Sequence, residues 1–244
     1  MLSKKLLFDG DVLIYRCAWA EQESDEDTAK AKLDELIGQI INEVDPYGSP
    51  SDRKFFLTGR GNFRNDIAKT AVYKGNRKAT EKPIHFQTLR DWLISQYDAT
   101  VTEGYEADDA IAIMANYIGY DNVVVISIDK DFEQLPTTIF NPSKWEWKTV
   151  DPWAATKNFY KQILTGDRVD NIIGLHGIGP VKAEKLLEGC DSEKALYNAC
   201  IDAYDEGKYG GDISAYNKAK ERVLENGRLL WIQRSLGELW QPPQ

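Results

Sequence analysis

Gly104-Tyr105-Glu106-Ala107-Asp108-Asp109 is followed by the apolar run Ala110-Ile111-Ala112-Ile113-Met114-Ala115. The apolar side chains recur at spacings of three and four residues, which predicts a helix that is buried in the core. The three acids in its first turn can simply complement the helix dipole, at a gain of about 0.3 to 1 kcal/mol each. A site that uses several carboxylates is the alternative, and acids elsewhere in the chain favour it.

Other acids follow segments that we predict as buried strands. Asp9 comes directly after the apolar residues 6–8. Asp129 and Asp131 come after residues 122–128, the strongest strand candidate in the chain. A charge in such a place is costly unless it is paired or bound to a metal. These acids therefore favour a functional site over simple capping.

Strands and helices alternate along the first part of the chain. We predict strands at residues 6–8, 54–58, 99–102 and 122–128, and helices at 12–20, 28–44, 84–97 and after 106. This order predicts an α/β fold with a mostly parallel central sheet flanked by helices. From residue 151 onward the pattern is mainly helical, including a last long helix at 213–232. Ligands of such sheets bind beyond the carboxyl ends of the strands, where Asp9 and Asp129 stand.

Size and composition are those of an ordinary soluble globular protein, with 244 residues of which 42% are hydrophobic and 28% charged. No apolar run has the length of a membrane span, so we expect no membrane partner. The three scattered cysteines form neither a disulfide framework nor a metal-ligand spacing, which favours a cytoplasmic location. Two histidines leave little room for histidine-based catalysis or a zinc site.

Eight acids are candidates for one edge of the predicted sheet: Asp9, Glu106, Asp108, Asp109, Asp129, Asp131, Asp167 and Asp170. The last two stand three residues apart, on one face of a turn or helix start, where capping is the alternative. Like charges in contact repel by about 1 kcal/mol per pair in water and by more in protein. Such a cluster needs cations, and oxygen ligands without His or Cys select Mg²⁺ or Mn²⁺. Two such ions about 4 Å apart are a common arrangement for attack of water on a phosphodiester.

Positive charge is concentrated in one segment although the net charge is −9. Residues 53–82 contain nine Lys or Arg and only two acids. Inside this segment, Lys74, Arg77 and Lys78 share a face if the chain is helical, and this face suits phosphates. Tyr73 is placed to stack on a base. A solvated basic face without a specific role is the alternative.

A glycine hairpin, Gly177-Ile178-Gly179, precedes Pro180 and an apolar helix that carries Lys182. Its glycines allow a tight turn whose backbone N–H groups approach a DNA phosphate closely. Pro180 fits the first turn of the following helix. A bare Gly-x-Gly also fits an ordinary turn between helices, but the residues that follow make DNA binding the more specific interpretation.

The order of these motifs resembles the 5′-nuclease family, in its small bacteriophage 5′→3′ exonuclease and flap endonuclease branch. The motifs are Asp9-Gly10-Asp11, Tyr73-Lys74-Gly75-Asn76-Arg77, Glu106-Ala107-Asp108-Asp109, Asp129-Lys130-Asp131, Gly166-Asp167-Arg168-Val169-Asp170-Asn171-Ile172 and Gly177-Ile178-Gly179-Pro180. The resemblance implies a PIN-like catalytic core over residues 1–163, with a basic arch or loop at about 62–82. It implies a helical helix-three-turn-helix region over residues 164–244 that grips duplex DNA and is packed as one unit with the core.

The resemblance also implies roles for individual residues. Asp9, Glu106 and Asp108 would hold one Mg²⁺, while Asp129, Asp131 and Asp170 would hold the second, with Asp109 and Asp167 as supporting acids. Lys74 and Arg77 match the arch residues that contact the scissile phosphate. The segment from Gly177 to Lys182 matches the duplex grip, where relatives also bind K⁺ through backbone carbonyls.

One position departs from the family pattern. Members usually carry an acid at the end of the second strand, where this chain has Thr58-Gly59-Arg60. The first metal site then lacks an outer ligand, or uses water or Asp11 in its place.

Two rival functions are a phosphatase of the haloacid-dehalogenase type and a DNA-binding protein with an inactive site. The phosphatase explains residues 6–12 and Thr58 but not the motif at 106–109 or the glycine hairpin. We therefore expect a metal-dependent nuclease that acts near the 5′ ends of duplex DNA, on flaps or on RNA primers. We expect it to act as a monomer, and no stretch of the sequence identifies a protein partner.

Overall fold

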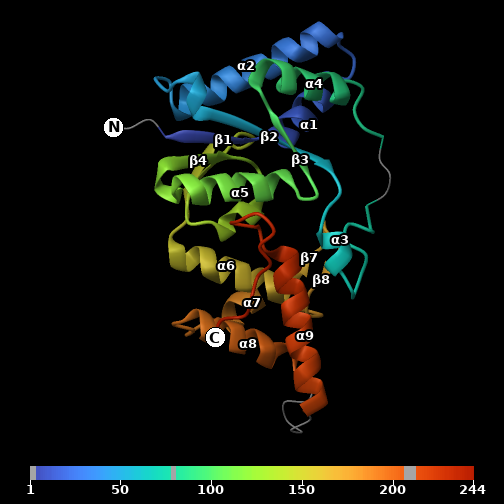
Figure 1. The fold of residues 1–244 in the computed structure, drawn as a ribbon, viewed down its shortest axis with the longest axis vertical. Coiled ribbons are helices and arrows are strands. Elements are labelled where there is room, and N and C mark those ends of the chain that lie inside the picture. The colour runs from blue at the N-terminus through green and yellow to red at the C-terminus, as the bar shows by residue number, and fades with distance from the viewer. Residues whose placement is uncertain (1–3, 78–80, 206–212) are drawn as a thin grey trace. The chain divides into compact units, whose positions relative to one another are not determined.

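The computed structural model describes residues 4–77, 81–205 and 213–244 (Figure 1). The chain divides into two compact units. The first comprises residues 1–62, 80–150 and 234–236, and the second comprises 63–79, 151–233 and 237–244. This division differs from the predicted boundary at residue 163, because α6 (Pro152–Thr165) packs against helices of the second unit. Residues 63–79, most of the predicted arch at about 62–82, belong to the second unit rather than to the first.

A six-stranded sheet forms the centre of the first unit. Its strands, in spatial order, are β3 (Thr100–Glu103), β2 (Arg53–Arg60), β1 (Lys5–Asp9), β4 (Val123–Ile126), β5 (Thr138–Asn141) and β6 (Glu146–Thr149). All neighbouring strands run parallel except β6, which is antiparallel to β5. The predicted mostly parallel α/β sheet is therefore confirmed. The hairpin of β5 and β6 was not predicted, since every residue of β6 is exposed and it lacks an apolar pattern.

Helices cover both faces of this sheet (Figure 1). The helices α1 (Gly10–Ala20), α2 (Glu26–Val44) and α4 (Phe86–Tyr97) pack together on one face, in a core that includes Leu6 and Phe8 of β1. On the other face α5 (Ala107–Ile118) lies against β1 and β2. Three short 3₁₀ helices connect these elements: η1 (Pro50–Asp52), η2 (Tyr120–Asn122) and η3 (Lys130–Gln134).

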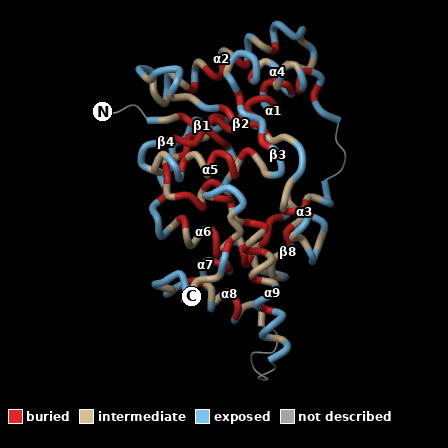
Figure 2. Tube along the Cα trace, viewed as in Figure 1, coloured by how far each residue is buried: buried red, intermediate tan, exposed pale blue. Residues whose placement is uncertain are grey.

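The two central strands are buried along nearly their whole length (Figure 2). The four residues of β4 are all Val or Ile, whose branched side chains fit a strand with both faces covered. Phe8 of β1 pairs with Ile126 of β4, so these parallel strands end side by side. The residues that follow each strand are thereby delivered to the same edge.

The second unit is mainly helical, as predicted for the C-terminal part of the chain. Its helices are α3 (Arg64–Ile67), α6, α7 (Pro180–Leu186), α8 (Glu193–Tyr204) and α9 (Ile213–Leu230). A small antiparallel ribbon, β7 (Gly166–Asp167) with β8 (Ile172–Ile173), was not predicted. The buried guanidinium of Arg64 donates to the carbonyls of Leu229 (2.8 Å) and Trp231 (2.8 Å), which anchors α3 in this unit. Among the described helices, none is both long and apolar enough to cross a membrane.

Candidate active site

Acidic side chains gather at the carboxyl edge of the central sheet. Asp9 is the last residue of β1, Asp129 follows the end of β4, and Glu106 immediately precedes α5. Asp108 interacts electrostatically with Asp9, Asp129, Glu106 and Asp109. We call this group, together with Asp131 in the first turn of η3, the acidic edge. The structure thus brings four of the predicted acids around the carboxylate of Asp108, and Asp131 follows two residues after Asp129.

Asp9 is buried and is held by neighbouring donors. The Ser127 hydroxyl donates to its Oδ2 (2.8 Å), and the backbone N–H of Val12 donates to its Oδ1 (3.3 Å). Burial raises the pKa of Asp9 to about 7, and these hydrogen bonds offset only part of that effect. A free carboxylate of this kind is thus poorly accommodated without a nearby positive charge.

Ser127 was missed by the sequence reasoning. Besides donating to Asp9, its hydroxyl accepts the backbone N–H of Asp129 at 3.1 Å, so it links the ends of β1 and β4. A signal existed, because Ser127 is the one polar residue in the apolar run 123–128. A hydroxyl at that place cannot be explained by packing alone.

Asp108 is crowded by other carboxylates of the acidic edge. Part of its surface remains accessible, yet the fold crowds its carboxyl from several sides. Burial and then the carboxylates of Asp9, Asp129 and Glu106 raise its pKa well above the usual range. Desolvation and like charges act in the same direction here, which is typical of functional sites.

Glu106 and Asp109, both predicted as metal ligands, also cap the helix that carries them. The backbone N–H of Glu106 donates to Asp109 Oδ2 at 3.1 Å, and the Glu106 side chain accepts the backbone N–H of Asp109. This reciprocal arrangement is a capping box. Asp109 is fully buried, so its main visible role is to fix the start of α5.

Asp167 and Asp170 belong to the second unit, where Asp167 ends β7 and Asp170 lies in the turn between β7 and β8. Asp167 Oδ1 accepts the backbone N–H groups of Val169 (2.6 Å) and Asp170 (3.2 Å). The eight predicted acids are therefore divided between the units, six in the first and two in the second. These two hydrogen bonds to Asp167 stabilise the turn that follows it, which is the capping role given above as the alternative.

The carboxylate of Asp170 is surrounded by groups of the basic segment. Its Oδ2 accepts the Tyr73 hydroxyl (2.7 Å), and its Oδ1 accepts a guanidinium N–H of Arg77 (2.7 Å). The Lys74 ammonium lies 3.7 Å from Oδ2. The backbone N–H of Lys74 donates to the Asp170 carbonyl at 2.8 Å. We call residues 72–77 the basic turn, which is fastened to Asp170.

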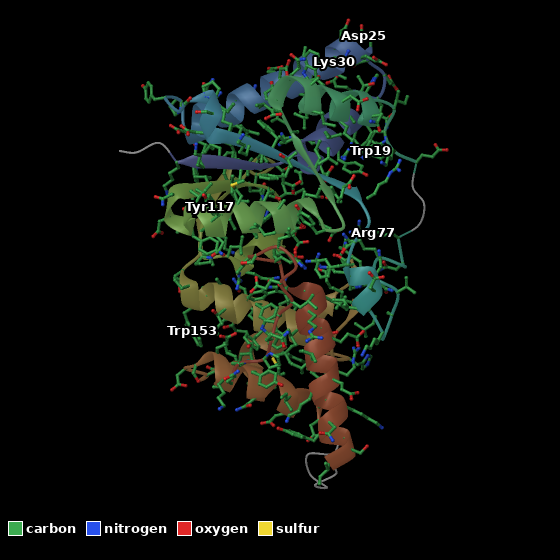
Figure 3. All side chains as sticks on the ribbon, viewed as in Figure 1. Trp19, Asp25, Lys30, Arg77, Tyr117 and Trp153 are labelled. Atoms are coloured by element: carbon green, nitrogen blue, oxygen red, sulfur yellow. The ribbon has the colours of Figure 1, made fainter. Side chains whose placement is uncertain are left out.

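Two expectations for this segment need correction, and a third falls outside the described residues. The basic turn is not a helix, and Lys74 adopts a positive φ of 54°, so Lys74 and Arg77 do not share a helical face. Tyr73 is buried in the core of the second unit, which leaves no open ring face for a base. Lys78 lies outside the described residues. Arg77, labelled in Figure 3, keeps half of its side chain exposed.

The glycine hairpin has the predicted local form. Gly177 has a positive φ of 71°, Gly179 precedes α7, and Pro180 is the first residue of that helix. The Lys182 ammonium donates to the carbonyl of Gly177 at 2.9 Å, so this carbonyl already attracts a cation. Gly177, Gly179 and Lys182 are exposed, whereas Ile178 packs partly against the core.

Oxygen ligands at the acidic edge suit a hard divalent cation. Among the described residues, no three His, Cys, Asp or Glu side chains already form a compact metal-binding group. Mg²⁺ usually keeps several of its water ligands and binds through one or two carboxylates and substrate phosphates. The donor chemistry and the raised pKa values of Asp9 and Asp108 therefore fit such an ion.

Similar proteins define the class of this chain. A family model described as the 5′-3′ exonuclease, N-terminal resolvase-like domain, matches residues 4–167. The chain belongs to this family, which confirms the resemblance and the PIN-like fold expected from it. The family match is inconsistent with the phosphatase alternative, which is therefore wrong.

The relatives differ in how much of their own length this chain matches. DNA polymerase I of Caldicellulosiruptor bescii is 29% identical over 80% of this chain, which spans only 25% of that protein. Flap endonuclease Xni of Vibrio cholerae is 28% identical, with 79% of each chain covered. The structure of T5 5′-exonuclease with bound zinc has a TM-score of 0.65 at 20% identity, over 93% of this chain and 88% of that one. This chain thus corresponds to about a quarter of the polymerase and to most of the two nucleases.

Proposed function

We propose that this protein is a metal-dependent phosphodiesterase that hydrolyses DNA near 5′ ends, as a 5′→3′ exonuclease or flap endonuclease. The observation that carries the proposal is Asp108 among Asp9, Glu106 and Asp129, in a fold of the 5′-3′ exonuclease family. Buried carboxylates in such numbers are stabilised by cations, and nuclease chemistry requires cations at the phosphate. Similarity to a protein named as a flap endonuclease supports the same class.

Two Mg²⁺ or Mn²⁺ ions are the cofactors we propose. Asp9, Glu106 and Asp108 would hold one ion. Asp129, Asp131 and Asp170 would hold the second, with Asp109 and Asp167 in support. Bound there, the ions would lower the pKa of water and stabilise charge on the attacking and leaving oxygens. K⁺ at the hairpin carbonyls, such as that of Gly177, is a further proposal.

The protein's own cations would act on the substrate phosphate. Lys74 and Arg77 are held beside the Asp170 carboxylate, and each carries a charge that a phosphate can attract. Bidentate contact by Arg77 would orient the phosphate, and Lys74 would stabilise the charge that builds as the bond breaks. A phosphate would compete with Asp170 for both groups.

Duplex DNA would be bound through the second unit. Gly177, Gly179 and Lys182 present exposed backbone and an ammonium group at the start of α7. Ile178 would support this hairpin from the core side, and Lys78 would add a phosphate contact. The substrates we propose are duplexes with a 5′ end, a flap or an RNA primer, bound by a monomer in the cytoplasm.

Cleavage of 5′-labelled duplex and flap DNA in Mg²⁺, in Mn²⁺ and in chelator tests this function. We expect metal-dependent release of 5′ mononucleotides or short oligonucleotides, and the product lengths separate exonuclease from flap endonuclease action. Asp131→Asn should abolish cleavage while DNA binding is preserved or strengthened, because the substitution removes a metal ligand and a negative charge. DNA binding without cleavage by the unmodified protein in either metal would instead indicate an inactive DNA-binding protein.

A further inference from the structure

The end of β2 lies against the start of α5 through the side chain of Thr58. The backbone N–H of Ala107, the first residue of α5, donates to Thr58 Oγ1 at 3.1 Å. The first N–H groups of a helix have no partner within the helix, so an acceptor from another element sets where the helix begins. Here that acceptor is supplied by the neighbouring strand, next to Glu106 and one residue before Asp108.

Thr58 is itself held on both sides of its backbone. Its N–H donates to Asp11 Oδ2 at 2.8 Å, and its carbonyl accepts a guanidinium N–H of Arg90 at 2.9 Å. Asp11 and Arg90 therefore hold the backbone of the residue whose hydroxyl accepts from Ala107.

Asp11 and Arg90 close this network. Arg90 of α4 lies 3.4 Å from Asp11 Oδ1, and both side chains are largely buried, at 14% and 23% exposure. Asp11 stands in the first turn of α1, two residues after Asp9. The network thus joins α1, α4, β2 and α5. Asp9 caps the start of α1, and Asp108 lies in the first turn of α5.

Asp11 has both carboxylate oxygens engaged by this network. Oδ2 accepts from Thr58 and Oδ1 faces Arg90. Both oxygens of the Asp11 carboxylate thus face protein donors of β2 and α4. The sequence alone left open whether Asp11 replaces a missing metal ligand at the end of β2. In this geometry Asp11 instead holds Thr58 and Arg90 in place.

We propose that Thr58, held by Asp11 and Arg90, is the positioning residue that sets where Glu106 and Asp108 stand at the acidic edge. The inference rests on the proposed function for its catalytic consequence but not for its effect on metal binding. Groups that orient metal ligands without touching the metal commonly change affinity or activity by about 10- to 100-fold when they are removed. Thr58 belongs to this kind of residue.

Thr58→Val is the first test, because valine keeps the shape and the backbone contacts but loses the hydroxyl that accepts from Ala107. Mn²⁺ binding, followed by the electron paramagnetic resonance of the free ion, should weaken by about tenfold. In DNA cleavage, kcat should fall and the Mg²⁺ concentration for half-maximal rate should rise, with KM for DNA unchanged. Thr58→Ser should restore both, since serine retains the hydroxyl.

Thr100→Val is the matched control, because Thr100 is an exposed residue of the neighbouring strand β3. It should behave as the unmodified protein does. If Thr58→Val binds Mn²⁺ and responds to Mg²⁺ as Thr100→Val does, the positioning role is overturned. A merely structural role would lower thermal stability in both Thr58 variants without the recovery by serine.

Asp11→Asn is a second variant, which tests the positioning role if Thr58→Val does not fold. It should bind the same number of Mn²⁺ ions with lower affinity, whereas loss of one ion would make Asp11 a ligand and refute the assignment. If the unmodified protein cleaves no DNA, the proposed function fails, but the Mn²⁺ titrations still decide this inference. If it cleaves DNA and the variants are unaffected, only this inference fails.

Discussion

Asp108 of the first unit is surrounded by other carboxylates, whereas Asp170 of the second unit is surrounded by Tyr73, Lys74 and Arg77. The first arrangement raises the free energy of the folded chain until a cation enters. The second already contains its cations and holds the basic turn in place. Replacing each of these two aspartates by asparagine is therefore expected to change the stability of the folded chain in opposite directions.

Among the substitutions that test this contrast, the largest effect should come from Asp108→Asn on DNA cleavage. Loss of a metal ligand that stabilises the transition state by several kcal/mol should lower kcat by about 1,000-fold. Asp121→Asn, at an exposed acid in η2, is the control and should leave kcat unchanged. Steady-state cleavage of a flap substrate in saturating Mg²⁺ measures the difference. An Asp108→Asn variant of normal activity would remove Asp108 from the metal site.

Lys74→Ala should have the next largest effect, on the catalytic step more than on binding. A cation that acts as charge builds on the phosphate contributes mainly to the transition state, so kcat should fall by about 100-fold. The dissociation constant for duplex DNA should change little. Single-turnover rates and a binding titration in Ca²⁺ separate the two quantities. An equal loss in both would show that Lys74 only holds the DNA.

The smallest effects, and the most direct test of the comparison, concern thermal stability in chelator. Asp170→Asn should lower the free energy of unfolding by about 1 to 2 kcal/mol, because the bonds from Tyr73 and Arg77 lose a charged acceptor. Asp108→Asn should raise it by about 1 kcal/mol, since it removes a carboxylate from among like charges. In a chain of this size each kcal/mol corresponds to about 2–4 °C in Tm.

Differential scanning calorimetry of the two variants and of Asp121→Asn measures these shifts. Shifts of the same sign for Asp108→Asn and Asp170→Asn would contradict the contrast between the two sites. Addition of Mg²⁺ should stabilise the unmodified protein more than it stabilises Asp108→Asn, because ligand binding to the folded state adds to stability.

Much of the fold follows from local patterns in the chain. Strands such as 6–8 and 122–128 were predicted because continuous apolar runs must be buried, and the helix after Glu106 because its apolar residues have helical spacing. The exposed strand β6 was missed because its stability comes from pairing with β5, a contact between residues that carry no apolar alternation. The basic turn was misjudged for a similar reason, since Asp170 holds it from about a hundred residues away.

The sequence by itself determined the α/β class, the acids at the strand ends and the family, because these depend on residue types and short spacings. Only the tertiary structure decided what each acid meets. Ser127 hydrogen-bonds both Asp9 and Asp129. Asp11 pairs with Thr58 and Arg90, and the buried Tyr73 donates to Asp170. The physical reason is that burial and charge neighbours are set by the packing of distant elements. The same aspartate becomes a metal ligand, a cap or half of an ion pair according to what the fold brings within 3 to 4 Å of it.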